Sequence, residues 1–293
     1  MSTVPQLSIS TGGPMLFDRT GRSSAPGRRR SAARQQPAAR QRQADASGPE
    51  RWKGSSPLMD LSDRKLKVLA RSLVDGLAGE RERALAVYQY IRRMPLAATS
   101  KWGARTARAV MERKRGDAVD KATLFVALLR IAGLPARVVF APVAADVLRG
   151  LATDMASTPR PFVEVRVAGD WIRTDTYIFD AAYMDAAHHR LRTQREEYGY
   201  GVSTAGAQGW NGQRNAYVLG VEQEDTFSDT DERAFHDVRD FARSLRMVER
   251  LKLLVNVFRW NAQAQQLDRS LRALRARQPR PPAPRGKRKP AAR

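Results

Sequence analysis

Residues 115–137 read RGDAVDKATLFVALLRIAGLPAR, and this stretch decides the fold. Asp117 is suited to cap a helix, because its carboxylate can accept hydrogen bonds from the backbone N–H groups of the first turn. Apolar residues follow at spacings of three and four, which place them on one helix face. Gly133 suits the left-handed residue that ends a helix, and Pro135 prevents continuation. The stretch therefore predicts a helix between Asp117 and Gly133 with one buried stripe.

The surrounding segments predict an α+β fold. Three stretches after this helix have the β-branched and aromatic content of strands, and a Gly-Asp turn between the last two predicts a hairpin. The expected strands are 136–142, 161–168 and 171–178. Amphipathic patterns predict helices before the stretch, at about 60–76, 84–95 and 106–114.

Residues 115–137 resemble the nucleophile region of the transglutaminase-like superfamily, which has a papain-related cysteine protease fold. The family's usual form is Gly-Asp-Cys, an apolar helix, and Gly-(Ile/Leu)-Pro-Ala-Arg. Ala118 stands where the family carries its cysteine, and the chain contains no cysteine at all. The resemblance covers about residues 78–220. It implies that the nucleophile-position helix packs on an antiparallel sheet.

The resemblance continues downstream, where the family has a His four residues before a Glu and an Asp shortly after a Trp. Glu164, Trp171 and Asp175 match this pattern, but Arg160 stands at the His position. The family's triad positions therefore correspond to Ala118, Arg160 and Asp175. The resemblance therefore implies a bacterial member of the superfamily that lacks the catalytic Cys and His.

These substitutions predict a pseudoenzyme. The first turn of a helix favours a thiolate, but the methyl group of Ala118 cannot attack a carbonyl. Arg160 stays protonated and cannot act as a general base at neutral pH, so we expect it to pair with Asp175. The resemblance implies a retained cleft that binds a peptide or protein, without a cofactor or a metal ion. The residues expected to line it are Asp117, Ala118, Arg160, Glu164, Trp171 and Asp175.

An active amide hydrolase or acyltransferase with a noncanonical nucleophile is an alternative. Thr123, Ser157 and Thr158 provide hydroxyl groups nearby in the sequence. His188 and His189 would point in different directions on a helix or a strand, so we expect a surface pair rather than two metal ligands. The lack of cysteine excludes zinc ribbons and disulfide frameworks.

The charge is concentrated at the two ends of the chain. The net charge is +22, of which residues 1–53 carry +7 and residues 269–293 carry +10, leaving +5 for the part between them. Composition predicts disordered basic tails at 1–55 and 278–293. Such tails either solubilise the protein or bind nucleic acid and other polyanions weakly, so a nucleic-acid-associated protein is a further alternative.

The predicted transglutaminase-like domain spans residues 56–225, and a helical extension spans 226–277. We expect this extension to be a helix pair that packs back on the domain, with a break near 261–263. A partner-binding or dimerising helix is an alternative, whereas the mixed charges before residue 250 disfavour a membrane-surface helix. The sequence predicts no transmembrane segment and a cytoplasmic protein. The expected buried stripe is Phe235, Val238, Phe241, Leu245, Val248, Leu251, Val255 and Phe258.

Overall fold

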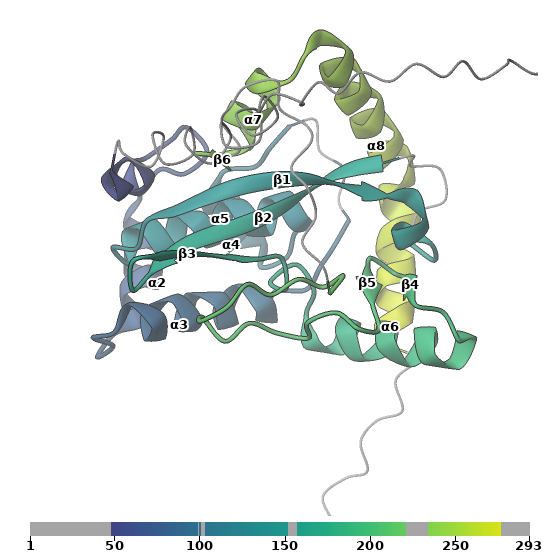
Figure 1. Cartoon of the computed structure of the whole chain (residues 1–293). Coiled ribbons are helices and arrows are strands. Elements are labelled where there is room, and N and C mark those ends of the chain that lie inside the picture. Colours follow the sequence, from purple (N-terminus) through teal and green to yellow (C-terminus); the bar gives the residue numbers. More distant parts are fainter. Residues whose placement is uncertain (1–47, 99, 101–102, 152–156, 221–233, 277–293) are drawn as a thin grey trace, which may run out of the picture.

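The computed structural model describes residues 48–98, 100, 103–151, 157–220 and 234–276 (Figure 1). Its centre is a four-stranded sheet with the order β3-β2-β1-β6, in which all neighbouring strands are antiparallel. The strands are β1 (Ala136–Ala144), β2 (Ser157–Val167), β3 (Asp170–Thr174) and β6 (Ala234–Phe235). A small second sheet pairs β4 (Tyr198–Gly199) with β5 (Val202–Ser203).

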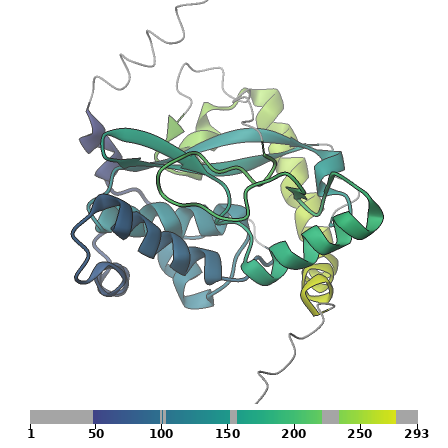
Figure 2. The same ribbon diagram turned by 60° about the horizontal axis from the view of Figure 1, so that its bottom comes forward.

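Helices cover one face of the main sheet, as Figures 1 and 2 show. The helices before the sheet are α2 (Arg64–Val74), α3 (Glu80–Arg93), α4 (Ala107–Arg113) and α5 (Ala118–Ile131), preceded by the 3-10 turn η1 (Pro49–Lys53). Those after β1 are η2 (Ala145–Leu148), α6 (Ala181–Gln194), α7 (Val238–Ser244) and α8 (Met247–Ala276). The mixed α+β class, the antiparallel sheet and the C-terminal helix are therefore as predicted.

Helix α5 begins with the predicted cap. The Asp117 carboxylate accepts from the backbone N–H of Asp120 at 3.0 Å, and the Asp120 carboxylate accepts from the backbone N–H of Asp117 at 3.4 Å. Gly116 is required here, because a Cβ at this position would lie 2.6 Å from the Cβ of Asp120. All residues from 120 to 130 are buried, so the prediction of a single buried stripe was too narrow. A helix buried on all sides lies at the centre of the core.

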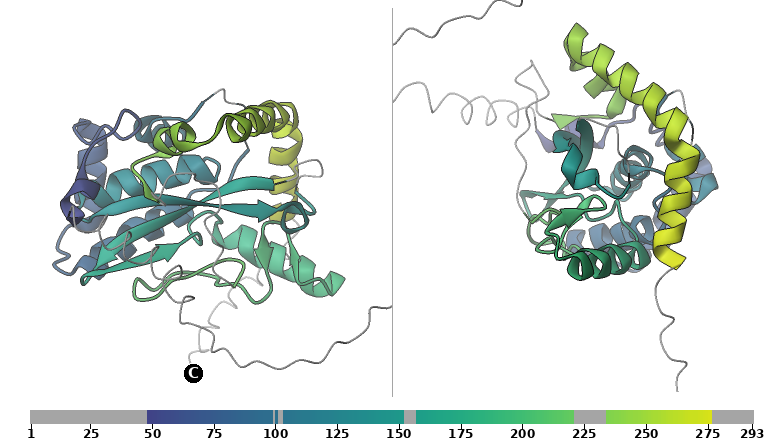
Figure 3. Two further views of the ribbon diagram at one scale, coloured as in Figure 1. Left: turned by 45° about the horizontal axis from the view of Figure 1, so that its top comes forward. Right: turned by 90° about the vertical axis from the view of Figure 1, so that its right-hand side faces the viewer.

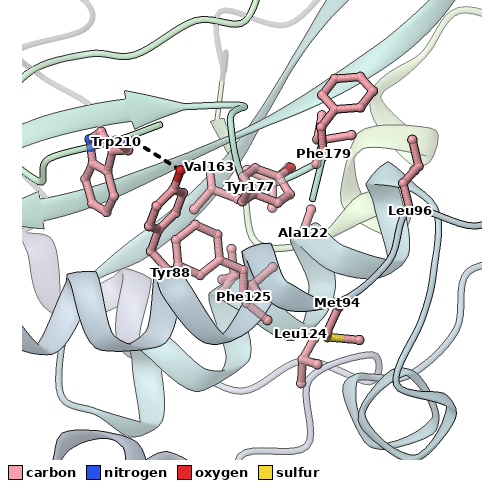
Figure 4. Packing of buried hydrophobic residues seen from close by; sticks show 14 of the residues in the cluster. Tyr88, Met94, Leu96, Ala122, Leu124, Phe125, Val163, Tyr177, Phe179 and Trp210 are labelled. Atoms are coloured by element: carbon pink, nitrogen blue, oxygen red, sulfur yellow. Dashed lines mark hydrogen bonds between the residues drawn. The ribbon is translucent and has the colours of Figure 1, made fainter. Parts of the chain in front are cut away.

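Aromatic rings connect this helix to the rest of the core (Figure 4). Phe125 of α5 lies between Tyr88 and Tyr177, with ring centroids at 6.2 and 5.2 Å. The hydroxyl of Tyr88 accepts from the backbone N–H of Trp210 at 3.1 Å. The segment that follows the small sheet is thereby attached to the helical layer.

Two predicted boundaries were wrong. Strand β3 ends at Thr174 rather than at residue 178, because the buried Asp175 turns the chain and its carbonyl accepts from the N–H of Ile178 at 3.1 Å. The predicted tail of residues 1–55 also extends too far, since Trp52 in η1 is buried against the ring of His236. Residues 1–47 and 277–293 lie outside the described residues.

The C-terminal extension differs from its prediction. Phe235 lies in β6, the break falls between α7 and α8, and α8 continues through residues 261–263. Leu251, Val255 and Phe258 are exposed instead of buried. The inner face of α8 uses a different set at alternating spacings of four and three: Leu253, Val257, Trp260, Ala264, Leu267, Leu271 and Leu274. Among the described helices, none is long and apolar enough to cross a membrane.

An ion pair fixes this orientation of α8. Arg275 donates to the carboxylate of Asp180 at 2.5 Å and to the carbonyl of Leu96 at 2.8 Å. Asp180 also caps α6 by accepting from the N–H of Tyr183 at 3.1 Å. Burial raises the pKa of Asp180, but the hydrogen bonds and charge of Arg275 outweigh burial and hold this pKa below its usual value. The pair therefore joins the end of α8 to the start of α6.

We expect Arg275→Met to lower the free energy of unfolding by about 2 kcal/mol, between the effects typical of exposed and buried pairs. Amide hydrogen exchange should rise in the last turns of α8. Because the pKa of Asp180 is depressed, the pair's contribution is present above the unfolded-state pKa and is lost as pH falls through the folded-state pKa.

Arg272→Met is the matched control, because Arg272 is exposed and pairs with Asp268 on the same helix. Urea unfolding should show a loss below about 0.5 kcal/mol for this variant. Equal losses for the two variants would show that the pair with Asp180 has no special role.

Candidate functional site

A pocket of about 410 Å³ opens at the start of α5. It lies between α5, the beginning of β2, and the helices α7 and α8. Three charged residues line it, Asp117, Arg160 and Arg239, and the other lining residues are apolar or glycine. Helix α8 contributes a wall of five side chains: Leu253, Val257, Trp260, Leu267 and Leu271.

Ala118 is the first residue of α5 and lines the pocket. None of the described lining residues has a thiol, hydroxyl, amine or imidazole group. The hydroxyl of Thr123 is buried and donates to the carbonyl of Val119 at 2.9 Å, so it faces the helix itself. The side chains of Ser157 and Thr158 lie outside the described part of the structure. The described part of the pocket therefore offers no nucleophile.

The predicted pair between Arg160 and Asp175 is confirmed. Nη1 of Arg160 lies 3.1 Å from Oδ2 of Asp175, and Nη2 donates to the carbonyl of Gly201 at 2.8 Å. The second carboxylate oxygen of Asp175 accepts from the N–H of Val218 at 2.9 Å. Burial raises the pKa of Asp175, although the charge of Arg160 opposes this shift. Arg160 therefore binds the carboxylate with a fixed positive charge.

Asp117 lines the pocket as predicted, but Glu164, Trp171 and Asp175 do not. Asp175 lies behind Arg160 and is completely buried. Asp175 therefore affects the pocket only by holding the guanidinium of Arg160 in place.

Glu164 and Trp171 belong to a separate ion-pair cluster on the sheet. Glu164 accepts from Arg137 of β1 at 2.5 Å and from Arg173 of β3 at 2.8 Å, each directly opposite it in the register. Burial raises the pKa of Glu164, but the two arginines outweigh burial and lower it. The Arg137 guanidinium also lies 4.0 Å from the ring centre of Trp171. Glu164 and Trp171, which match the family pattern in the sequence, therefore help to hold β1, β2 and β3 together and do not line the pocket.

The prediction that His188 and His189 form a surface pair was wrong. His188 is buried in α6, whereas His189 is exposed, so the two side chains do point in different directions. Within the described ranges, no group of three His, Cys, Asp or Glu residues could hold a metal ion.

Lys121 is a buried group that the sequence analysis did not identify. Its ammonium group donates to the carbonyls of Met94 at 2.8 Å and Ile178 at 2.9 Å, and burial lowers its pKa to about 7. The amine lies inside the core and not among the pocket residues. The sequence did contain a signal for its burial, because Lys121 lies three residues before Leu124 and therefore on the apolar side of the predicted helix.

The wall formed by α8 was also not predicted as part of the site. Its signal was present in the alternating spacing of four and three from Leu253 to Leu271. Such a pattern predicts one packed helix face, but it does not identify the surface against which that face packs.

Replacing Arg160 with Met should lower the free energy of unfolding by about 3–5 kcal/mol, because the buried carboxylate of Asp175 loses its countercharge. The pKa of Asp175 is already raised, and it should rise further in this variant. Protonation of the Asp175 carboxylate stabilises the folded state. This stabilisation is present below the unfolded-state pKa and is lost as pH rises through the folded-state pKa. The defect should therefore grow from acidic to neutral pH in urea titrations.

Arg149→Met provides the comparison, since Arg149 forms an exposed pair with Glu196. We expect a loss of at most about 1 kcal/mol with little dependence on pH. A similar small loss for Arg160→Met would mean that the buried pair is not important for stability.

The comparison with family models agrees with the fold. Residues 67–176 match the family model of the transglutaminase-like superfamily. A search of curated proteins gives no match. Among solved structures, a proposed cysteine protease from Cytophaga hutchinsonii is 21% identical, with a TM-score of 0.35 over 42% of this chain and 39% of that protein. A proposed protease from Parabacteroides distasonis is also 21% identical, with a TM-score of 0.31 over 42% of this chain and 24% of that protein.

The matched region spans less than half of either solved protein. Residues 67–176, which match the family model, contain the capped helix α5, the Gly133 turn and the strands that follow it. The family resemblance therefore rests on residues 67–176, which match the transglutaminase-like superfamily.

Proposed function

We propose that this chain is a catalytically inactive transglutaminase-like protein that binds an apolar segment of a peptide or protein in the pocket at Ala118. The observation that carries the proposal is the lining of this pocket. A methyl group occupies the nucleophile position, and the neighbouring Arg160 is held by Asp175 and Gly201. These groups can fill or shape a binding site but cannot perform acyl transfer.

The shape and chemistry of the pocket support an apolar ligand group. Its volume of about 410 Å³ lies in the range of sites that hold small ligands or several side chains. An extended peptide backbone needs hydrogen-bond partners, and its burial without them is costly. The described pocket offers few such partners, because Arg160 already donates to two groups. We therefore expect apolar side chains of the ligand, and not its backbone, to enter.

Binding can be tested with fluorescent peptides that carry Leu or Phe at their centre, compared with otherwise identical Ser peptides. Ala118→Trp should fill the pocket and weaken binding of the apolar peptides at least about tenfold, as expected for losing one buried large side chain. Fluorescence anisotropy measures the dissociation constants.

Ala181→Trp is a matched control, because Ala181 is likewise the first residue of a helix but is exposed and outside the pocket. It should bind these peptides like the unmodified chain. The proposal fails if apolar and Ser peptides bind alike, or if Ala118→Trp leaves the affinity unchanged. Turnover of an amide or ester panel that is lost in Ala118→Trp would instead favour the alternative of an active enzyme.

The nucleophile position itself can be probed by restoring the family's residues. We expect Ala118→Cys with Arg160→His to produce a thiol with a pKa below the usual value of about 8.5, because the helix N-terminus and an imidazolium favour the thiolate. The chain has no other cysteine, so the pH dependence of iodoacetamide alkylation reports on this thiol alone.

Ser72→Cys on the exposed part of α2 serves as the reference thiol. Its alkylation should follow an ordinary cysteine pKa. If the two alkylation profiles coincide, the start of α5 is not preorganised for an anionic nucleophile.

A further inference from the structure

The N-terminal half of α8 exposes a stripe of large apolar side chains. Their exposed fractions are 69% for Met247, 55% for Leu251, 55% for Leu254, 48% for Val255 and 60% for Phe258. At 3.6 residues per turn these five positions share one helix face. A contiguous exposed apolar patch of this kind marks an interaction surface.

This outer stripe has no role in closing the pocket. The opposite side of the same helix contributes Leu253, Val257 and Trp260 to the pocket wall. Figure 3 shows that this half of α8 lies at the periphery, with no other described element on its outer side. The helix is therefore apolar on two sides, and its inner side packs against the core through Leu253 and Trp260.

Basic residues flank the outer stripe. Helical geometry places Arg250 about a quarter turn from the stripe on one side, with Lys252 and Arg259 on the other. All three are exposed. Glu249 lies on the opposite side of the helix with 19% of its side chain exposed, and it reaches Lys252 at 2.9 Å, so the charge of Lys252 is matched within the helix. The outer face thus combines an apolar centre with basic edges and contains no acid.

We propose that this outer face, Met247 to Phe258, binds the surface of an anionic lipid bilayer. A helix of this type lies in the plane of the interface, with its apolar side chains at the acyl boundary and its basic side chains near the phosphates. Residues 269–293 follow later in the sequence and carry a net charge of +10, which adds to the attraction of the whole chain to anionic lipids.

Two observations favour a lipid surface over a second copy of this chain. The stripe lies on a convex helix and not in a groove, so a rigid partner would need a groove of its own. Self-association would bring together two basic faces of a protein whose net charge is +22, and like charges oppose this. The described acids between residues 234 and 250, which argued against membrane binding in the sequence, do not lie on the outer face: Asp237 and Asp240 belong to the start of α7, and Glu249 points away.

The test is co-sedimentation of the full chain with vesicles of phosphatidylcholine and phosphatidylserine, and with vesicles of phosphatidylcholine alone. The chain should bind the anionic vesicles more tightly, and high salt should weaken this binding. Leu254→Ser with Phe258→Ser should weaken it at least about tenfold, because two large side chains no longer leave water. Both residues are exposed, so the thermal unfolding midpoint should stay unchanged.

Val68→Ser is the control, because Val68 is 60% exposed on α2, away from this stripe. Its vesicle binding should equal that of the unmodified chain. The proposal is overturned if the double variant binds anionic vesicles as well as the unmodified chain, which would assign the binding to the tails. It is also overturned if the chain does not bind, or if sedimentation shows a dimer that the double variant loses. The pocket is not altered by these substitutions, so peptide binding at Ala118 should persist in every case.

Discussion

Burial of helix α5 is the constraint on which the rest of the structure depends. Residues 120–130 have no exposed side, so the helices α2, α3 and α4 and the sheet must surround them. The start of this helix is fixed as firmly as its middle. Asp117 and Asp120 cap one another, and Arg105 donates to the Asp120 carboxylate at 2.7 Å. The position of Ala118 thus follows from packing and capping alone.

This independence explains how the fold keeps its pocket with Ala118 at the start of α5 and Arg160 beside Asp175. The first helical position accepts Ala readily, because Ala has the highest helix propensity and has no polar group to satisfy. At the neighbouring position, Arg160 satisfies the buried Asp175 by charge and the Gly201 carbonyl by a hydrogen bond. Gly201 has a φ of +80°, and an added Cβ would lie 2.9 Å from the Phe179 ring, so this approach to Arg160 favours glycine. In the described part of the site, neither Ala118 nor Arg160 leaves a buried polar group without a hydrogen-bond partner.

Helix α8 changes what the pocket can hold. Its inner face places Trp260 and the aliphatic side chains around it opposite the start of α5, and its end is held by Arg275 and Asp180. The resulting site is enclosed by apolar groups, which supports the proposal of an apolar ligand. The same helix presents its second apolar face outward, with Arg250 and Arg259 beside it. One element therefore connects the proposed pocket with the proposed lipid-binding surface.

Local signals in the sequence predicted the local structure well. The cap at Asp117, the turn at Gly133 and the pairing of Arg160 with Asp175 depend on a few residues or on one strand register, and all three are confirmed. The cleft role of Glu164 was wrong because its cross-strand partners, Arg137 and Arg173, decide its function.

The orientation of α8 could not be predicted from its own sequence. The helix carries two apolar stripes, and periodicity alone does not show which one faces the core. The choice depends on distant contacts, such as that of Arg275 with Asp180, which is 95 positions away. The same limitation concealed the pocket wall, since Trp260 and the start of α5 line one pocket only in the folded chain.

The most direct test of this account is whether Trp260 lies across the pocket from the nucleophile position. A bimane label on Ala118→Cys should be quenched by a nearby tryptophan, and the chain has no other cysteine to label. Because both residues line the same pocket, the account predicts that Trp260→Phe restores the bimane emission, whereas Trp171→Phe, a substitution outside the pocket, does not. Equal emission with and without Trp260 would contradict the placement of α8 over the site.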